Sequence, residues 1–174
     1  SEHSLDDIVL VKTVEVTCEY LENLHLLSIQ ILENNLNITI DESCKNIIFQ
    51  QNNSDYQVLA NIIYKKIELL DEEKLRQSKL PPKNREQLFY ANLIQHPGID
   101  IVLSSSPSGS GKTAIALANA MKLIDAPQRI YQKIIYIRNP IDSVDKDAYI
   151  GFKKGDLDAK MDGYFTPIYD ALEN

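Results

Sequence analysis

A run of small residues ending in Lys-Thr has the composition of a phosphate-binding loop. Residues 104–113 read SSSPSGSGKT. The pattern G-x-x-x-x-G-K-[ST] cradles phosphates with its backbone N–H groups, while its Lys reaches the phosphates and its Ser or Thr reaches Mg²⁺. Gly111, Lys112 and Thr113 match this pattern, but Ser106 stands where the first glycine is expected. Because G-K-T is short enough to arise by chance, the interpretation depends on the flanking elements.

Those flanking elements have the order that the loop requires. The apolar run IDIVLS (99–104) predicts a buried strand before the loop, and the alanine-rich run TAIALANAMKLI (113–124) predicts a helix after it. A second strand is predicted over KIIYIRN (133–139), and a helix over 84–97 ends at Pro97 and Gly98. We therefore expect a strand-helix-strand unit of a parallel sheet.

A helix that begins at such a loop offers unpaired N–H groups and the positive end of its dipole to an anion. Gly109 and Gly111 allow the backbone to fold over that anion without a Cβ in the way. We expect Lys112 to reach the β- and γ-phosphates of ATP, and Thr113 to coordinate Mg²⁺ as the metal ligand. These two are also the expected catalytic residues. The expected cofactor-binding residues of the loop are Ser108, Gly109, Ser110, Gly111, Lys112, Thr113 and Ala114.

The serine at position 106 is a departure from the motif. A Cβ there predicts either a tolerated backbone angle or a slightly altered loop, with an effect on affinity more than on function.

Composition and charge divide the chain in two. Its 174 residues are 44% apolar and 25% charged, which is typical of a globular protein. Residues 1–78 carry 14 acidic and 6 basic side chains, a net charge of −8, whereas 79–174 carry 11 and 12, a net charge of +1. Pro81 and Pro82 in KLPPKN predict a domain boundary there. The acidic first domain is not expected to be a general nucleic-acid clamp, because such binding uses Lys and Arg; a solvated acidic surface is the alternative.

The first domain reads as a small α+β unit. We expect strands at 7–16, 37–40 and 46–49, a helix at 20–36 and a long amphipathic helix at 55–79.

No apolar run is long enough to cross a bilayer, and the first residues do not form a signal peptide. Cys18 and Cys44 lie far apart, without a metal-binding pattern around them. We expect a soluble, cytoplasmic protein with no membrane partner.

The stretch 83–174 resembles the PhoH family, phosphate-starvation-inducible ATPases whose core is similar to the first domain of superfamily-one helicases. The resemblance is carried by KNREQLFY, SPSGSGKT, the strand ending in IRNP and above all IGFKKGDLDAKMDGYFTPIYDAL (150–172). Lys153 and Lys154 replace the family's usual Leu-Pro, which makes that loop more basic. The implied fold is α/β, with a P-loop (RecA/helicase-like) parallel-sheet core preceded by a small α+β, KH-like domain.

The resemblance also implies ATP and Mg²⁺ as cofactors, RNA or single-stranded nucleic acid as the substrate, and a homo-oligomeric ring. It places Gln87 to read adenine, with an exposed helix amide as the alternative. Arg138 is placed to contact a phosphate or a nucleic-acid strand, with a salt-bridged structural arginine as the alternative. The first domain lacks the G-x-x-G by which KH modules clamp nucleic acid, so packing or oligomer contacts are expected for it.

Hydrolysis also needs a carboxylate from a second strand to hold Mg²⁺ through its water shell. In the PhoH family this would be an apolar strand ending in Asp-Glu. The downstream acids Asp142, Asp145 and Asp156 lack an apolar run before them. We therefore expect these residues to be the amino-terminal portion of a longer ATPase, or a form that turns ATP over poorly. A nucleotide-gated assembly module and a small-molecule P-loop kinase are the alternative functions.

Overall fold

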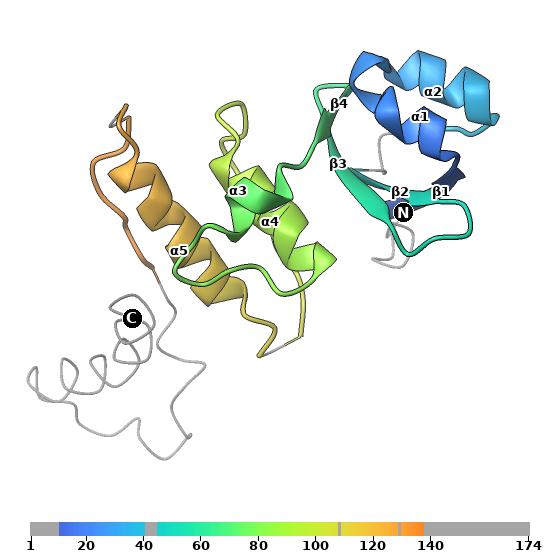
Figure 1. Ribbon diagram of the computed structural model, residues 1–174. Helices are drawn as coiled ribbons and strands as arrows, with labels where there is room; N and C mark the ends of the chain where they lie inside the picture. Colours follow the sequence, from blue (N-terminus) through green and yellow to red (C-terminus); the bar gives the residue numbers. More distant parts are fainter. Residues whose placement is uncertain (1–10, 41–44, 108, 129, 138–174) are drawn as a thin grey trace, which may run out of the picture. The chain divides into compact units, whose positions relative to one another are not determined.

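The computed structural model describes residues 11–40, 45–107, 109–128 and 130–137 (Figure 1). It is an α/β structure that divides into two compact units, considered separately below. The first unit comprises the residues up to Arg76 together with 82–102. The second comprises 77–81 and the residues from Leu103 onward.

A four-stranded mixed sheet forms the centre of the first unit. Its strands are β1 (Val11–Val16), β2 (Asn46–Gln51), β3 (Gln57–Ile63) and β4 (Lys66–Leu69), in the spatial order β1-β2-β3-β4. β1 and β2 run parallel, and the other two pairs are antiparallel. The strand predicted at 7–16 is confirmed over 11–16, residues 7–10 lying outside the described residues, and the strand predicted at 46–49 is confirmed. The strand predicted at 37–40 is wrong: Asn37 ends a helix in the left-handed conformation (φ 50°), and no strand follows at 38–40.

The helix predicted over 20–36 is three shorter pieces. These are α1 (Cys18–Glu22), the 3₁₀ turn η2 (Leu24–Leu26) and α2 (Ile29–Leu36). The hydroxyl of Ser28 accepts a hydrogen bond from the Ile31 N–H at 3.2 Å and caps α2. Ser28 fits the helical spacing of its neighbours, but a serine is a strong N-cap, and here that local bond starts a new helix.

The long helix predicted over 55–79 is wrong, because most of that segment is a β-hairpin. Strands β3 and β4 are joined at Tyr64 and Lys65, whose φ values of 49° and 61° are typical of a two-residue type I′ turn. Only α3 (Glu72–Arg76) is helical there. The apolar residues fit either period, and the turn carries no Asn-Gly signal, so pairing with β2 decides the structure.

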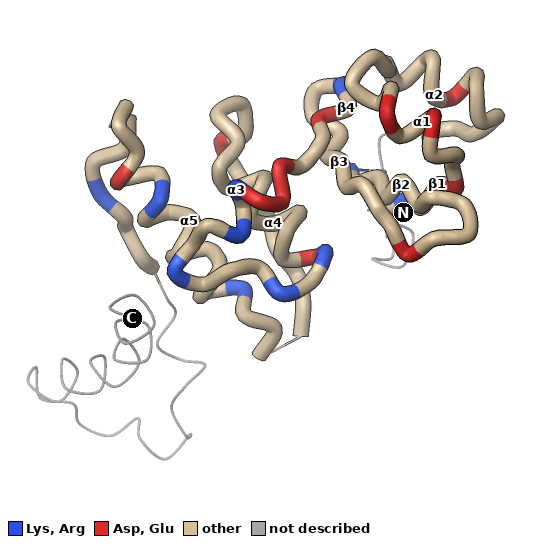
Figure 2. The backbone as a smooth tube through the Cα atoms, viewed as in Figure 1, with Lys and Arg blue, Asp and Glu red and all other residues tan. Residues whose placement is uncertain are grey.

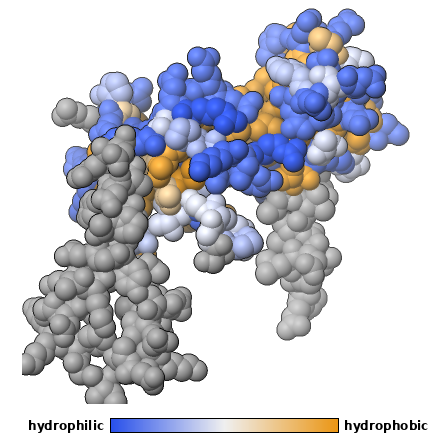
Figure 3. All heavy atoms as spheres, turned by 60° about the horizontal axis from the view of Figure 1, so that its bottom comes forward, coloured by the Kyte–Doolittle hydropathy of each residue, from blue (hydrophilic) through white to orange (hydrophobic). Residues whose placement is uncertain are grey.

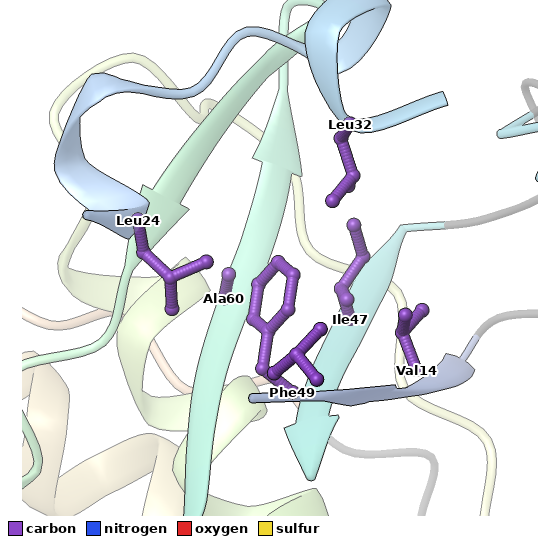
Figure 4. Packing of buried hydrophobic residues seen from close by; sticks show 7 residues of the cluster. Val14, Leu24, Leu32, Ile47, Phe49 and Ala60 are labelled. Carbon is purple, nitrogen blue, oxygen red and sulfur yellow. The ribbon is translucent and has the colours of Figure 1, made fainter. Parts of the chain in front are cut away.

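The side chains of each strand alternate between the two faces of the sheet, and helices pack on both faces at β3. One face packs against α1, η2 and α2 in a core that includes Val14, Leu24, Leu32, Ile47 and Phe49 (Figure 4). On the other face, β3 packs against α4 (Arg85–Gln95), the helix predicted over 84–97. The first compact unit therefore includes α4.

The second unit contains α5 (Lys112–Asp125), which confirms the helix predicted over 113–124. The strands predicted at 99–104 and 133–139 are not seen in the described residues: neither 99–107 nor 133–137 forms a strand, and 138–139 lie outside the described residues. A strand exists only where a neighbour supplies the hydrogen-bond ladder, and no described segment pairs with either run. Their apolar side chains are exposed, 92% for Leu103, 70% for Ile135 and 87% for Ile137.

The charged residues of the helices differ between the two units. The charged residues of α1 and α2 are all acidic and α3 carries both signs, whereas α5 carries Lys112, Lys122 and Asp125 (Figure 2). Hydrophobic residues reach the surface between hydrophilic ones in the space-filling view (Figure 3). None of the helices in the described part of the chain has the length and apolar character needed to cross a bilayer.

Candidate functional site

The candidate site is the loop that leads into α5. Gly109 and Gly111 both have positive φ, 79° and 81°, a backbone conformation that residues with a Cβ rarely adopt. A Cβ built on Gly109 would meet no atom within 4 Å, so glycine is required there by the backbone angle and not by crowding. Gly111 is the N-cap of α5 and has no side chain to cap the helix. No side chain of the N-cap residue therefore accepts a hydrogen bond from the first N–H groups of α5. An anion site at a helix N-terminus needs such N–H groups.

The lysine of the loop is held over the loop backbone. Nζ of Lys112 donates to the carbonyl oxygens of Ser106 at 2.6 Å and Pro107 at 2.9 Å. It also lies 3.3 Å from Oγ of Ser110. The cation at the first turn of α5 therefore folds back over the loop, so positive charge and the helix N-terminus are in the same place.

Ser106 is accommodated without a strained backbone. The φ angle of Ser106 is not positive, so this position does not need a glycine to reach a left-handed conformation. Its hydroxyl lies 2.7 Å from the hydroxyl of Ser110, which bridges the loop. The tolerated angle anticipated from the sequence is what the structure shows. The bridge was missed, although two serines four residues apart on either side of the turn were a visible signal.

Three further residues were predicted to bind the nucleotide or the metal, namely Thr113, Ala114 and Ser108. Thr113 is exposed in the first turn of α5, and Ala114 follows it, half-buried. The next residue, Ile115, is buried and anchors the helix start through its N–H, which donates to the Gly111 carbonyl at 2.9 Å. Ser108 lies outside the described residues. An exposed hydroxyl beside the helix N-terminus suits a Mg²⁺ ligand, since Mg²⁺ prefers oxygen.

The predicted adenine-reading glutamine has a structural role in the first unit. Oε1 of Gln87 accepts a hydrogen bond from the Lys83 N–H at 2.7 Å, and its own N–H donates to Oδ1 of Asn84 at 2.9 Å. The bond to Asn84 caps the start of α4, and the bond to Lys83 ties the residue before the cap to the first turn, an arrangement similar to a capping box. Gln87 belongs to the first unit and the loop to the second, so adenine recognition stays a prediction.

The other predicted residues lie outside the described residues. These are Arg138 and the three candidate acids Asp142, Asp145 and Asp156. Within the described ranges, no three His, Cys, Asp or Glu side chains gather in a way that could hold a metal ion. A role of Thr113 as a ligand of Mg²⁺ stays a prediction.

A glycine loop that opens a helix and carries a lysine folded over it has the features of the P-loop class of nucleotide-binding proteins. The model of the PhoH family, described as PhoH-like protein, matches residues 79–174, more than half of the chain. The chain belongs to the PhoH family, which is a family of P-loop NTPases.

Individual relatives agree with this assignment. The chain is 34% identical over 99 residues to the PhoH-like protein of Mycobacterium leprae, covering 56% of this chain and 26% of that protein. It is 36% identical over 92 residues to Protein PhoH2 of Bacillus subtilis, covering 53% and 20%. It is 30% identical over 97 residues to Protein PhoH of Escherichia coli, covering 55% and 25%. The chain thus spans about a quarter of the length of these relatives. No solved structure matches it significantly.

Proposed function

We propose that the chain binds ATP with Mg²⁺ through residues 109–113 and forms part of an ATPase that acts on RNA or single-stranded nucleic acid. The observation that carries the nucleotide half is the position of Lys112, whose ammonium lies over the loop at the N-terminus of α5. Membership of a P-loop NTPase family supports the same ligand. The nucleic-acid half and assembly into a ring are supported by the resemblance to helicase-like ATPases.

Each residue of the loop has a distinct task in this proposal. The backbone N–H groups around Gly109 and Gly111 bind phosphate oxygens, which the glycine angles make accessible. Lys112 exchanges its carbonyl acceptors for the β- and γ-phosphates and neutralises their charge. Thr113 directs its hydroxyl to the metal. Mg²⁺, when bound, supplies charge neutralisation at the phosphates.

Nucleotide binding is tested by removing the lysine. Lys112→Ala should weaken binding of Mg-ATP by about 10- to 100-fold, as expected for loss of a hydrogen bond to a charged group of roughly 1.5–3 kcal/mol. Lys122→Ala, in the last turn of the same helix, is the matched control and should bind as the parent does. Isothermal titration calorimetry gives both affinities. Unchanged binding by Lys112→Ala would overturn the proposal.

Turnover and the nucleic-acid partner need a second experiment. ATP hydrolysis is measured with and without single-stranded RNA, with Lys112→Ala as the blank. Turnover above the blank that rises with RNA supports an RNA-coupled ATPase. Binding without turnover would place the carboxylate that orients Mg²⁺ outside these 174 residues.

A nucleotide-gated assembly module is the second candidate, favoured by the exposed apolar side chains of Leu103, Ile135 and Ile137. Extended apolar segments with unpaired edges promote association between copies. Light scattering with and without Mg-ATP tests this candidate. A nucleotide-dependent change in mass without turnover would favour it over the ATPase.

A further inference from the structure

The one position at which the loop departs from the motif is central to the hydrogen bonds of the loop. Ser106 contributes its carbonyl oxygen to Lys112, at 2.6 Å from Nζ. Its hydroxyl lies 2.7 Å from the hydroxyl of Ser110, and that hydroxyl in turn lies 3.3 Å from Lys112 Nζ. Ser106 is therefore one acceptor for the lysine and is bonded to a second.

These contacts account for all the donors of the lysine. An ammonium group has three N–H donors and no acceptor. Three acceptors of the loop lie within hydrogen-bond distance of Nζ, namely the carbonyls of Ser106 and Pro107 and the hydroxyl of Ser110. A phosphate oxygen can engage this cation only after at least one of them is released.

We propose that Ser106 is a positioning residue that holds Lys112 on the loop in the nucleotide-free protein and thereby weakens and slows polyphosphate binding. Its hydroxyl fixes Ser110 as a third acceptor, which a glycine at this position could not do. This inference rests on the proposed function, because it takes the loop to be the nucleotide site. Removing the hydroxyl should free the lysine and tighten binding.

The test compares substitutions that separate the hydroxyl from the Cβ. Ser106→Ala removes the hydroxyl alone, Ser106→Gly removes both, and Ser106→Thr keeps both. Stopped-flow binding of a ribose-labelled fluorescent ATP analogue with Mg²⁺ should show ~2–10-fold tighter binding for Ala and Gly, as expected for one neutral hydrogen bond. The gain should lie mainly in the association rate, and Thr should restore the parent's behaviour.

A matched control and a nucleotide-free readout complete the test. Ser105→Ala removes an exposed neighbouring hydroxyl and should bind as the parent does. Without nucleotide, a small acylating reagent followed by mass spectrometry should label Lys112 faster in Ser106→Ala than in the parent, relative to Lys122 in the same molecule. Labelling at the parent's rate would overturn the inference.

The outcomes distinguish the inference from the proposed function. If the parent binds the analogue better than Lys112→Ala, but Ser106→Ala binds no tighter than the parent, the inference alone fails. If only Ser106→Gly binds more tightly, the Cβ and not the hydroxyl is responsible, and the inference again fails. If no form binds better than Lys112→Ala, the proposed function fails and the inference fails with it.

Discussion

The imidazole Nε2 of His96, at the end of α4, lies 2.6 Å from a carboxylate oxygen of Glu68 in β4. The other ring nitrogen, Nδ1, accepts a hydrogen bond from the Gly98 N–H at 3.0 Å. A ring that accepts at Nδ1 and still binds a carboxylate donates from Nε2, so this geometry fits the neutral tautomer. The hydroxyl of Tyr64 donates to the Gly98 carbonyl. Together these bonds tie the end of α4 to the β3–β4 hairpin.

His96→Ala should lower the free energy of unfolding by about 1–2 kcal/mol, because it removes both ring hydrogen bonds. The hydrogen bond to Glu68 contributes less than a buried one, since the Glu68 side chain is 39% exposed and water competes for its carboxylate. Urea unfolding followed by circular dichroism measures the change. His25→Ala, at an exposed histidine in η2, is the control and should change stability by less than about 0.5 kcal/mol. Equal effects of the two substitutions would show that the hydrogen bonds of His96 to Glu68 and Gly98 do not contribute to stability.

Asn61→Leu should destabilise the first unit by about 2–4 kcal/mol. The fully buried Asn61 amide donates to Oδ1 of Asn46 at 2.5 Å and accepts from the Asn92 side chain of α4. A leucine leaves both partners without this amide in a buried setting. The same substitution at the exposed Asn35 of α2 is the control. If thermal unfolding shows no larger loss of stability for Asn61→Leu than for Asn35→Leu, the hydrogen bonds of Asn61 with Asn46 and Asn92 do not contribute to stability.

Lys65→Gly should stabilise the protein by about 0.5–1 kcal/mol, because Lys65 has φ 61° and glycine adopts that angle without a Cβ penalty. Lys66→Gly, one residue later inside β4, should destabilise it by a similar amount. Urea unfolding of the two variants shows whether each substitution raises or lowers the free energy of unfolding. In a helix both changes would destabilise, so a loss of stability in Lys65→Gly would contradict the hairpin.

Substitutions of Gln87 distinguish its role at the N-terminus of α4 from the proposed recognition of adenine. Gln87→Ala should lower stability by about 0.5–1 kcal/mol, whereas Gln87→Glu keeps the acceptor that binds the Lys83 N–H and should preserve it. If the amide also reads adenine, both variants should bind ATP more weakly relative to inorganic tripolyphosphate, which has no base. An unchanged ratio of the two affinities, measured by calorimetry, would leave Gln87 with a structural role only.

Local chemistry made part of this structure predictable. Helices α4 and α5 follow from helix formers between strong stop and start signals, Asn84 before one and a glycine loop before the other. The phosphate loop could be read for the same reason, since positive φ at Gly109 and Gly111 is a property of glycine itself. The spacing of Ser106 and Ser110 hinted at a bridge, but whether their hydroxyls meet depends on how the loop closes.

The sequence by itself therefore determined the loop, the helix that it opens, the first two strands of the sheet and the family. Tertiary structure decided the rest. The residues of β3 and β4 suit a helix or a hairpin equally in isolation, and only pairing with β2 on one side and α4 packing on the other select the hairpin. The runs at 99–104 and 133–137 show the converse: β-branched composition favours a strand, but without a neighbouring ladder no strand forms.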